Sequence, residues 1–318
     1  MAAGRSVKAW NPPDLMPSHP EPTGLAIGID LGGTRIKAAL VDRADGHLLQ
    51  RALRPTEDGD WQDGEPRFVH HVAELVAELE SASGQTGLPV GLAAPGLAAP
   101  AGNAITWMPG RMHGLEGLDW SACLQRPVRV VNDAQAALLA EVAFGAARGL
   151  GDVFLITLGT GVGGAVWSGG RLLTGARGRG GHLGHISLDW QGPQDVFHTP
   201  GSLEFLLGNQ TLSARTEGRF ASTLDLLAAV RAGVPKALAL WGQSMRVLAV
   251  GLSSLINVLD PELILLGGGI SEGAGEDLLI PLQSELDACE WRPGGHGVPV
   301  QLATAGEWAG AQGAAWQA

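Results

Sequence analysis

The sequence predicts an α/β protein built from two similar lobes that share an interface. With about 150 residues per domain as a guide, a chain of 318 residues favours two domains. Strand and helix patterns are mixed along the chain, which indicates the α/β class. The segments near 27–41 and near 153–167 both have the pattern strand, glycine-rich turn, strand. We interpret them as a weak internal repeat, which indicates two lobes of similar construction with room for an enzyme's cleft between them.

Composition excludes several classes of function. Hydrophobic residues make up 45% of the chain and charged residues 17%, as in a globular core, and the formal charge of −11 disfavours nucleic acid and anionic lipid as partners. Two cysteines, Cys123 and Cys289, are too few for a disulfide framework and favour a reducing cytoplasm. Four prolines break the longest uncharged stretch, 81–110, so we expect no membrane span. We expect residues 1–22, which are rich in proline, to form a disordered tail.

The elements of the first half follow in order. Residues 25–54 alternate apolar and polar side chains between turns, which predicts three antiparallel strands. Residues 67–83 have apolar side chains at helical spacing, and 88–96 read as a short apolar strand that ends in a loop. A strand over 127–133 then leads into a helix over 134–149.

The second half repeats the opening and adds a long helix. Residues 152–173 predict strand, glycine loop, strand, turn and strand. Apolar residues then step by three and four over 238–255, which predicts one long buried helix that ends at Asp260 before a proline. A strand over 263–266 and a third glycine run come next.

The first glycine turn has the composition of a phosphate site. Gly32 and Gly33 let backbone N–H groups approach a phosphate, Thr34 adds a hydroxyl donor, and Asp30 can hold Mg²⁺ through water or phosphate. An ordinary glycine hairpin is the alternative interpretation. Lys37, one of the chain's three lysines, is a further candidate for phosphate binding, although a strand lysine that faces solvent is the simpler account.

Two further glycine loops extend the pattern. The second runs from Gly159 through Thr160 and Gly161, and it matches G-x-G-x-x-G. A dinucleotide fold requires a helix after these glycines, whereas this chain continues as a strand, so we reject that fold. A loop of this kind that faces the first across a cleft would grip the terminal phosphates of a nucleotide. The third run, Gly267, Gly268 and Gly269, leaves room for a base and ribose, or is a plain strand-to-helix turn.

A candidate base stands between a strand and a helix, at Asn132 and Asp133. A carboxylate there accepts helix N–H bonds and lies where the sheet ends, although aspartate is also a common helix cap. Together with the three glycine loops, a carboxylate that can take a proton from an alcohol predicts a phosphotransferase.

Five motifs, in the same order over about residues 24–316, resemble the signatures of the ROK family of sugar kinases, within the hexokinase/actin-like superfamily. They are GIDLGGTRIKAALVD, VVNDAQAALLAE, LITLGTGVGGAVWSGGRLLTGARG, GHLGHISLD and NVLDPELILLGGGIS, and the tail AGAQGAA resembles the family's closing helix.

The resemblance implies a two-lobed actin-like ATPase fold of the ribonuclease H type with a central cleft. It implies a small lobe over 23–131, joined by a C-terminal helix over 305–318, and a large lobe over 132–304. The expected activity is phosphorylation of a hexose or N-acyl-hexosamine hydroxyl by ATP and Mg²⁺, in a homodimer.

The resemblance also assigns roles residue by residue. Asp133 matches the catalytic base, and it contacts the sugar together with Asn132, His185 and Glu204. The first phosphate motif maps to Asp30, Gly32, Gly33 and Thr34, the second to Gly159, Thr160 and Gly161, and the nucleoside loop to Gly267, Gly268 and Gly269.

The chain departs from the family's pattern around the sugar. His182 stands where the family has a glutamate, and we expect it to contact the sugar because it flanks the motif; packing in a glycine-rich loop is the alternative. In the segment WMPGR, Trp107 and Arg111 replace the family's asparagine and tryptophan. The departures leave the identity of the sugar open.

The family's zinc site is also changed. Asp195, Phe197 and Ser202 stand at its three cysteine positions, so we expect no zinc site of that kind. Apolar residues, among them Trp190 and Phe197, are expected to hold the loop by packing.

Two binding functions compete with the enzyme. One is a sugar-responsive repressor, which the acidic balance and the absence of a helix-turn-helix arm in the sequence disfavour. The other is a kinase-like sugar sensor or regulator without efficient turnover, which the presence of Asp133 and three glycine loops disfavours.

Overall fold

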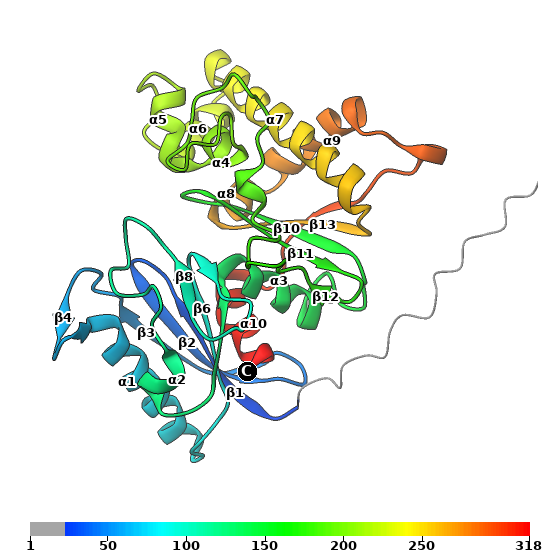
Figure 1. Cartoon of the computed structure of the whole chain (residues 1–318). Helices are drawn as coiled ribbons and strands as arrows, with labels where there is room; N and C mark the ends of the chain where they lie inside the picture. Colours follow the sequence, from blue (N-terminus) through cyan, green and yellow to red (C-terminus); the bar gives the residue numbers. More distant parts are fainter. Residues whose placement is uncertain (1–22) are drawn as a thin grey trace, which may run out of the picture.

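Two five-stranded sheets organise the structure, a computed structural model that describes residues 23–318 (Figure 1). The tail expected at residues 1–22 lies outside the described residues. The strands of the first sheet are β1 (Leu25–Leu31), β2 (Arg35–Asp42), β3 (Leu48–Pro55), β6 (Val90–Ala94) and β9 (Val128–Asn132). Those of the second are β10 (Val153–Leu158), β11 (Val162–Ser168), β12 (Arg171–Leu172), β13 (Leu263–Gly267) and β14 (Val300–Leu302). Two short hairpins pair β4 (Trp61–Gln62) with β5 (Glu65–Pro66) and β7 (Leu97–Ala98) with β8 (Ile105–Trp107).

The two sheets have the same topology. The first has the strand order β3-β2-β1-β6-β9, and the second has the order β12-β11-β10-β13-β14. In each sheet the first three strands along the chain pair antiparallel, and two later strands add in parallel. The predicted internal repeat is therefore confirmed, and so is the two-lobed α/β architecture.

Helices cover the sheets and fill the space between them. The first lobe carries α1 (Arg67–Ser83) and α2 (Trp120–Leu124), and α3 (Asp133–Phe144) and α10 (Ala309–Gln317) lie between the sheets. The second lobe carries α4 (Leu203–Leu207), α5 (Asn209–Arg215), α6 (Thr223–Arg231), α7 (Pro235–Leu259), α8 (Gly269–Ala274) and α9 (Glu276–Cys289). Short 3-10 turns occur at Leu183–His185, Pro293–Gly295 and Gly306–Trp308.

The long predicted helix is α7, and its ends follow from sequence. Pro235 is its first residue, and Asp260 ends it in a left-handed conformation with φ of 45°. The predicted buried stripe is wrong at Leu238, which is 48% exposed, because Ala237 takes the buried position in the first turn of the helix and the next buried residue is Trp241. Within residues 23–318, no helix combines the length and the apolar character that a membrane crossing requires.

The first sheet has one face for large side chains and one for small ones. Ile27 and Ile29 of β1 lie in the apolar cluster that α1 covers. Ala26, on the opposite face, lies in a second cluster with Ala311 of α10. Because side chains alternate along a strand, the sequence Ala-Ile-Gly-Ile presents bulk to α1 and almost none to α10.

Helix α10 lies in direct backbone contact with its neighbours. A Cβ atom on any of three glycines would overlap a carbonyl oxygen of the facing element: Gly28 in β1 (Ala311), Gly91 in β6 (Ala314) and Gly313 in α10 (Ala136 of α3). These glycines permit an approach that no other residue type allows. The helix is therefore wedged between the first sheet and α3.

The second sheet completes the layers. Leu138 of α3 packs with Leu155 on one face, and Phe154 packs with Leu248 of α7 on the other. From one lobe to the other, the order is α1, first sheet, α10 with α3, second sheet, and the helices α4 to α9 (Figure 1). The site at the N-terminus of α3 consequently depends on both lobes.

The contact at Gly91 yields a stability prediction. Gly91→Ala places a methyl group on the Ala314 carbonyl oxygen, so we expect it to lower the free energy of unfolding by about 3 kcal/mol, as overpacking does. Gly242→Ala is the control, because a Cβ at Gly242 on α7 meets nothing within 4 Å. Urea unfolding measures both, and equal stability of the two variants would contradict the wedge.

Candidate active site

The candidate base is positioned by a complete capping box at the start of α3. Asn132 Oδ1 accepts hydrogen bonds from the N–H groups of Ala134 at 2.9 Å and Gln135 at 3.4 Å. In return, the Asn132 N–H donates to Gln135 Oε1 at 3.2 Å, and Asn132 Nδ2 donates to the Gly96 carbonyl at 2.9 Å. The box holds Asp133 as the first residue of the helix.

Asp133 is open to solvent and yet surrounded by protein, as a residue at the base of a cleft is. Its surroundings raise the pKa of its carboxyl by removing water. The Ala134 N–H, which donates to Oδ1 at 2.8 Å, the positive charge of Arg111 and the Asn132 side chain oppose this rise. The Asp133 carboxylate is therefore more basic than an ordinary aspartate, and groups that stabilise its ionised form are already in place.

A second carboxyl lies close to the first. Asp30, at the end of β1, is half-buried, and burial together with the negative charge of Asp133 raises its pKa to about 6, against the opposing charge of Lys37. Two acids in one partly dry site disfavour each other's ionisation. The pair therefore forms a place where a cation would be stabilised.

Arg111 is a site residue that sequence reasoning missed. Its Nη1 lies 3.7 Å from where a Cβ atom on Gly33 would be, and its charge acts on Asp133, so it lies between the first glycine turn and the base. Among residues 23–318, no carboxylate forms an ion pair with it. The signal in the sequence was an arginine in the segment WMPGR, at a position where the resemblance led us to expect tryptophan.

The first glycine turn has the predicted form. The Gly32 N–H donates to the Arg35 carbonyl at 3.1 Å, and Thr56 Oγ1 donates to the Gly32 carbonyl at 2.5 Å. These bonds close the turn between β1 and β2 and leave Gly33 and Thr34 exposed at its tip.

Lys37 does not simply face solvent. Its Nζ donates to the Glu307 carbonyl at 2.5 Å and lies 5.9 Å from the centre of the Trp308 ring. Because its charge also reaches Asp30, Lys37 connects the start of the C-terminal segment to the carboxyl pair.

The second glycine loop is held from the large lobe. The Asn209 N–H donates to the Gly159 carbonyl at 3.0 Å, and the Gln210 N–H donates to the Thr160 carbonyl at 2.9 Å. Glu204 Oε2 accepts from the Val162 N–H at 3.1 Å. A Cβ atom at Gly159 would meet nothing within 4 Å, which leaves open space beside the loop.

A side chain at Gly161, unlike one at Gly159, would clash with the protein. A Cβ atom there would overlap the Glu204 carboxylate, so this glycine is needed for the contact between the loop and α4.

The third loop contains one glycine that has no room for a side chain and one that does. Gly268 has a φ of 84°, and a Cβ there would overlap the backbone of Leu158 at the end of β10. Gly269 begins α8 and faces open space, while Gly267 ends β13. The loop therefore lies directly beside the second one.

The two histidines lie together with unused polar atoms. The His182 and His185 rings are nearly parallel, with centroids 6.4 Å apart. His182 Nε2 and His185 Nδ1 are buried and have no hydrogen-bond partner in the described part of the chain. Burial, and to a lesser extent His185, lower the pKa of His182, so its ring is neutral at pH 7.

The loop over 186–202 is held mainly by polar contacts. Asp195 Oδ1 accepts from the N–H groups of Phe197 at 2.8 Å and Thr199 at 2.9 Å. The Ser202 side chain and these N–H groups keep the pKa of Asp195 low, although burial opposes them. The expectation that Trp190 packs here is wrong: its side chain is 79% exposed, and the Asp195 hydrogen bonds hold the loop in its place.

Phe197 does pack, and it joins the two lobes. Its ring centre is 5.2 Å from that of His185 at 85°, and 5.1 Å from that of Trp107 in β8 of the first lobe. An aromatic contact between the lobes thus stands where the sequence comparison placed a cysteine. No group of three or more metal-ligating side chains occurs in residues 23–318.

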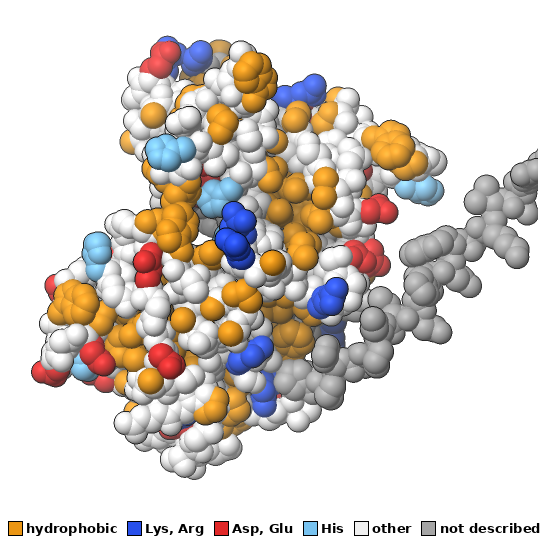
Figure 2. All heavy atoms as spheres, in the orientation of Figure 1, with side chains coloured by type: hydrophobic (Ala, Val, Ile, Leu, Met, Phe, Trp, Pro, Cys, Tyr) orange, Lys and Arg blue, Asp and Glu red, His pale blue; other side chains and the backbone are white. Residues whose placement is uncertain are grey.

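The predicted residues gather into one region. Arg111 lies beside the first glycine turn, and its charge acts on Asp133. Ala134 of α3 lies next to Gly163 of β11, and Gly268 of the third loop lies against Leu158 at the end of β10. On the face in Figure 2, basic and histidine side chains lie next to each other at the boundary between the lobes. Two lobes with repeated sheets, each with a glycine turn between its first two strands, define an actin-like two-lobed fold.

The family follows from comparison with known proteins. The profile of the ROK family matches residues 26–318, and the chain belongs to this family.

Relatives and solved structures agree with this assignment. The chain is 32% identical over 280 residues to a glucokinase of Thermotoga maritima, covering 82% of this chain and 86% of that protein. It is 32% identical over 255 residues to an N-acetylmannosamine kinase of Escherichia fergusonii, covering 78% and 84%. A ROK family glucokinase from Streptomyces griseus, solved in complex with glucose and AMPPNP, superposes with a TM-score of 0.75 at 29% identity, covering 93% of this chain and 99% of that one.

The open space at Gly159 allows a clean test of the phosphate loop. Gly159→Val adds bulk without a clash inside the protein, so we expect normal folding but a loss of ATP affinity of tenfold or more. Gly242→Val on α7 is the matched control. Calorimetry with AMPPNP measures the affinity, and unchanged binding by the Gly159 variant would exclude the loop from the nucleotide site.

Proposed function

We propose that this chain transfers the γ-phosphoryl group of ATP to a hydroxyl group of a hexose or an N-acyl-hexosamine, with Asp133 as the general base. The chain is a carbohydrate kinase. The observation that carries the proposal is the placement of Asp133 by the capping box, beside Asp30 at the end of β1 and within reach of the charge of Arg111. The names of the relatives, glucokinase and N-acetylmannosamine kinase, support the two classes of sugar.

The reaction balances with the groups present. A sugar hydroxyl oxygen attacks the γ-phosphorus in line as the bond to the β-phosphate oxygen breaks, and the hydroxyl proton goes to Asp133. Arg111 and the N–H groups of the glycine loops face the charge on the transferred group. General base assistance contributes about 10²- to 10⁴-fold, so positioning and electrostatics supply the rest.

Two buried ring nitrogens without hydrogen-bond partners in the described residues support the histidine pair as part of the proposed sugar site. His182 Nε2 and His185 Nδ1 lack hydrogen bonds within residues 23–318, and sugar hydroxyls would satisfy both. Glu204 has one oxygen engaged by Val162, which leaves Oε1 for a hydroxyl. Asn132 uses its oxygen as the helix cap and one amide hydrogen on Gly96, so only its second amide hydrogen serves the sugar.

Mg²⁺ fits the carboxyl pair. Asp30, whose pKa is raised partly by Asp133, would hold the ion through water or a phosphate oxygen, because a divalent cation removes the repulsion between the two carboxylates. When bound, Mg²⁺ neutralises negative charge on the nucleotide phosphates. The remaining phosphate and nucleoside contacts fall to Gly32, Gly33 and Thr34, to the second loop at Gly159, Thr160 and Gly161, and to the third loop at Gly267, Gly268 and Gly269.

The proposal extends to metal content and assembly. The chain keeps the 186–202 loop in place without zinc, supported by the Asp195 hydrogen bonds and by the packing of Phe197 edge-to-face with His185 and at a tilt against Trp107. It acts in the cytoplasm as a homodimer. Exposed apolar side chains on the outer helices, such as Val258 at 78% and Ile280 at 66%, are consistent with a covered face.

Asp133→Asn tests the base directly. The amide retains size and capping contacts but cannot take a proton, so we expect kcat to fall about 10²- to 10⁴-fold while sugar affinity stays within a few-fold. Asp119→Asn, the same change at the N-cap of α2, is the control. The assay couples ADP release to glucose, mannose, fructose, N-acetylglucosamine and N-acetylmannosamine. A wild type that binds sugar but releases no more ADP than the variant would favour the sensor.

The pH dependence follows from the direction of the pKa shift. Asp133 must be ionised to act, and burial raises its pKa, so activity falls with decreasing pH earlier than an ordinary aspartate would cause. Arg111 lowers this pKa, so Arg111→Gln is expected to move the acid limb of kcat/KM to higher pH. Arg148→Gln, an exposed arginine beyond α3, is the control. If the acid limb of the kcat/KM profile stays at the same pH in the Arg111 variant, Arg111 does not act on the base Asp133.

A further inference from the structure

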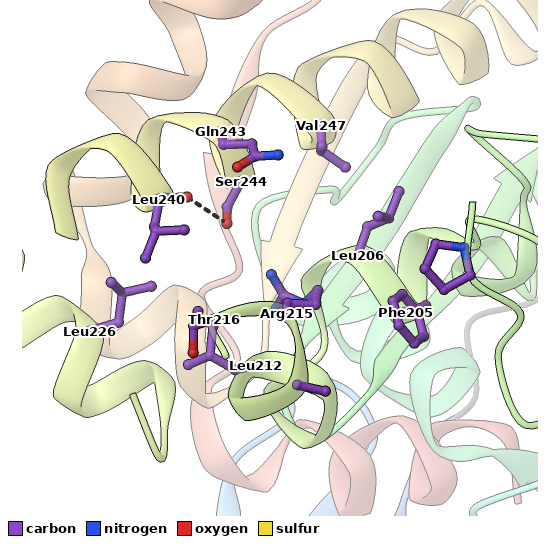
Figure 3. A pocket seen from close by; sticks show the side chains of 12 residues that line it. Phe205, Leu206, Leu212, Arg215, Thr216, Leu226, Leu240, Gln243, Ser244 and Val247 are labelled. Carbon is purple, nitrogen blue, oxygen red and sulfur yellow. Dashed lines mark hydrogen bonds between the residues drawn. The ribbon is translucent and has the colours of Figure 1, made fainter. Parts of the chain in front are cut away.

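A cavity of about 280 Å³ lies in the second lobe, between α4, α5, α6 and α7 (Figure 3). Most of its wall is apolar, and polar groups are few; its lining includes Phe205, Leu206, Leu212, Leu240, Val247 and Arg215. None of its lining residues belongs to the glycine loops, the carboxyl pair or the histidine pair. It is therefore separate from the site described above.

Arg215 brings an unbalanced charge to this cavity. Its Nε donates to Thr211 Oγ1 at 3.2 Å and its Nη2 to the Gly208 carbonyl at 3.2 Å. No carboxylate in residues 23–318 forms an ion pair with it, whereas the nearby Arg219 pairs with Glu217 at 3.1 Å. Burial lowers the pKa of Arg215 to about 10, with no neighbouring acid to offset the effect.

The direction of the side chain matters as much as its charge. Figure 3 shows Arg215 on α5 reaching into the space beneath α7, between Leu212 and Phe205. Nη1 makes no hydrogen bond within the described residues and is not enclosed, so it is free to bind a group inside the cavity.

We propose that this cavity binds a small amphipathic anion, with its carboxylate or phosphate head on Arg215 and an apolar body against Leu240 and Val247. A guanidinium in an apolar wall binds an anionic head strongly because water competes little there. A cavity of about 150 Å³ holds benzene, so one of 280 Å³ holds a molecule of roughly ten heavy atoms. A hexose lacks both the charge and the apolar body, which separates this ligand from the proposed substrate.

Contacts of Arg215 and Gly208 connect the cavity to the second glycine loop. The Gly208 carbonyl that Arg215 holds belongs to the residue that packs on Thr160 and Gly161. An anion that draws the guanidinium away from Gly208 would loosen this packing. Occupancy of the cavity is therefore expected to change the KM for ATP at least twofold; this coupling, unlike the binding itself, rests on the proposed function.

Calorimetry of the full chain with octanoate tests the binding. We expect octanoate, which has ten heavy atoms, to bind at least tenfold more tightly than acetate, inorganic phosphate or 1-octanol, which lack the body or the charge. Arg215→Gln is expected to weaken octanoate at least tenfold, and Arg219→Gln to leave it unchanged. Val247→Phe fills the cavity and keeps Arg215, so it should also abolish binding, even if the Arg215 variant folds poorly.

The same titrations define failure. Octanoate binding that survives Val247→Phe, or that 1-octanol equals, would overturn the proposal. Complete displacement of octanoate by saturating AMPPNP would assign the cavity to the nucleotide site and overturn the proposal as well, whereas a limited change in octanoate affinity is the reciprocal of the coupling. An unchanged KM for ATP with octanoate bound would reject the coupling alone. Because binding is measured without catalysis, a chain without kinase activity would refute the proposed function and leave this inference standing.

Discussion

The contact between α10 and its neighbours is the constraint on which the rest of the structure depends. Gly28 and Gly91 remove side chains from one face of the first sheet, and Gly313 does the same on the helix face toward α3. Backbone can then approach backbone, and three elements far apart in sequence become one rigid layer. Since α3 also packs on the second sheet, this layer fixes the two lobes with respect to each other at the base of the site.

Both ends of α3 are anchored by buried polar groups. At the N-terminus, Asn132 caps the helix and binds Gly96. At the C-terminus, the buried Glu141 carboxylate accepts from the N–H groups of Thr304 at 2.5 Å and Ala305 at 2.7 Å, just before the C-terminal segment. A helix held at both ends has little freedom to slide, so the position of Asp133 is set by the scaffold and not by substrate.

The electrostatics of the site follow from this placement. Asp30 at the end of β1 and Asp133 at the start of α3 are brought close, and the negative charge of Asp133 disfavours ionisation of Asp30. Arg111 from the first lobe and Lys37 from β2 oppose this effect at the two carboxyls. The carboxyl pair is therefore poised for a cation, and His182 is neutral at pH 7 because burial lowers its pKa.

The sequence by itself determined the α/β class, the repeat, the bounds of α1 and the end of α7, because periodicity, glycine turns and caps act over a few residues. It also indicated the glycine loops and Asp133. Tertiary structure decided that Arg111 faces the base, that Phe197 bridges the lobes and that Trp190 stays exposed. These outcomes depend on which surfaces meet across the chain, and local pattern carries no record of such contacts.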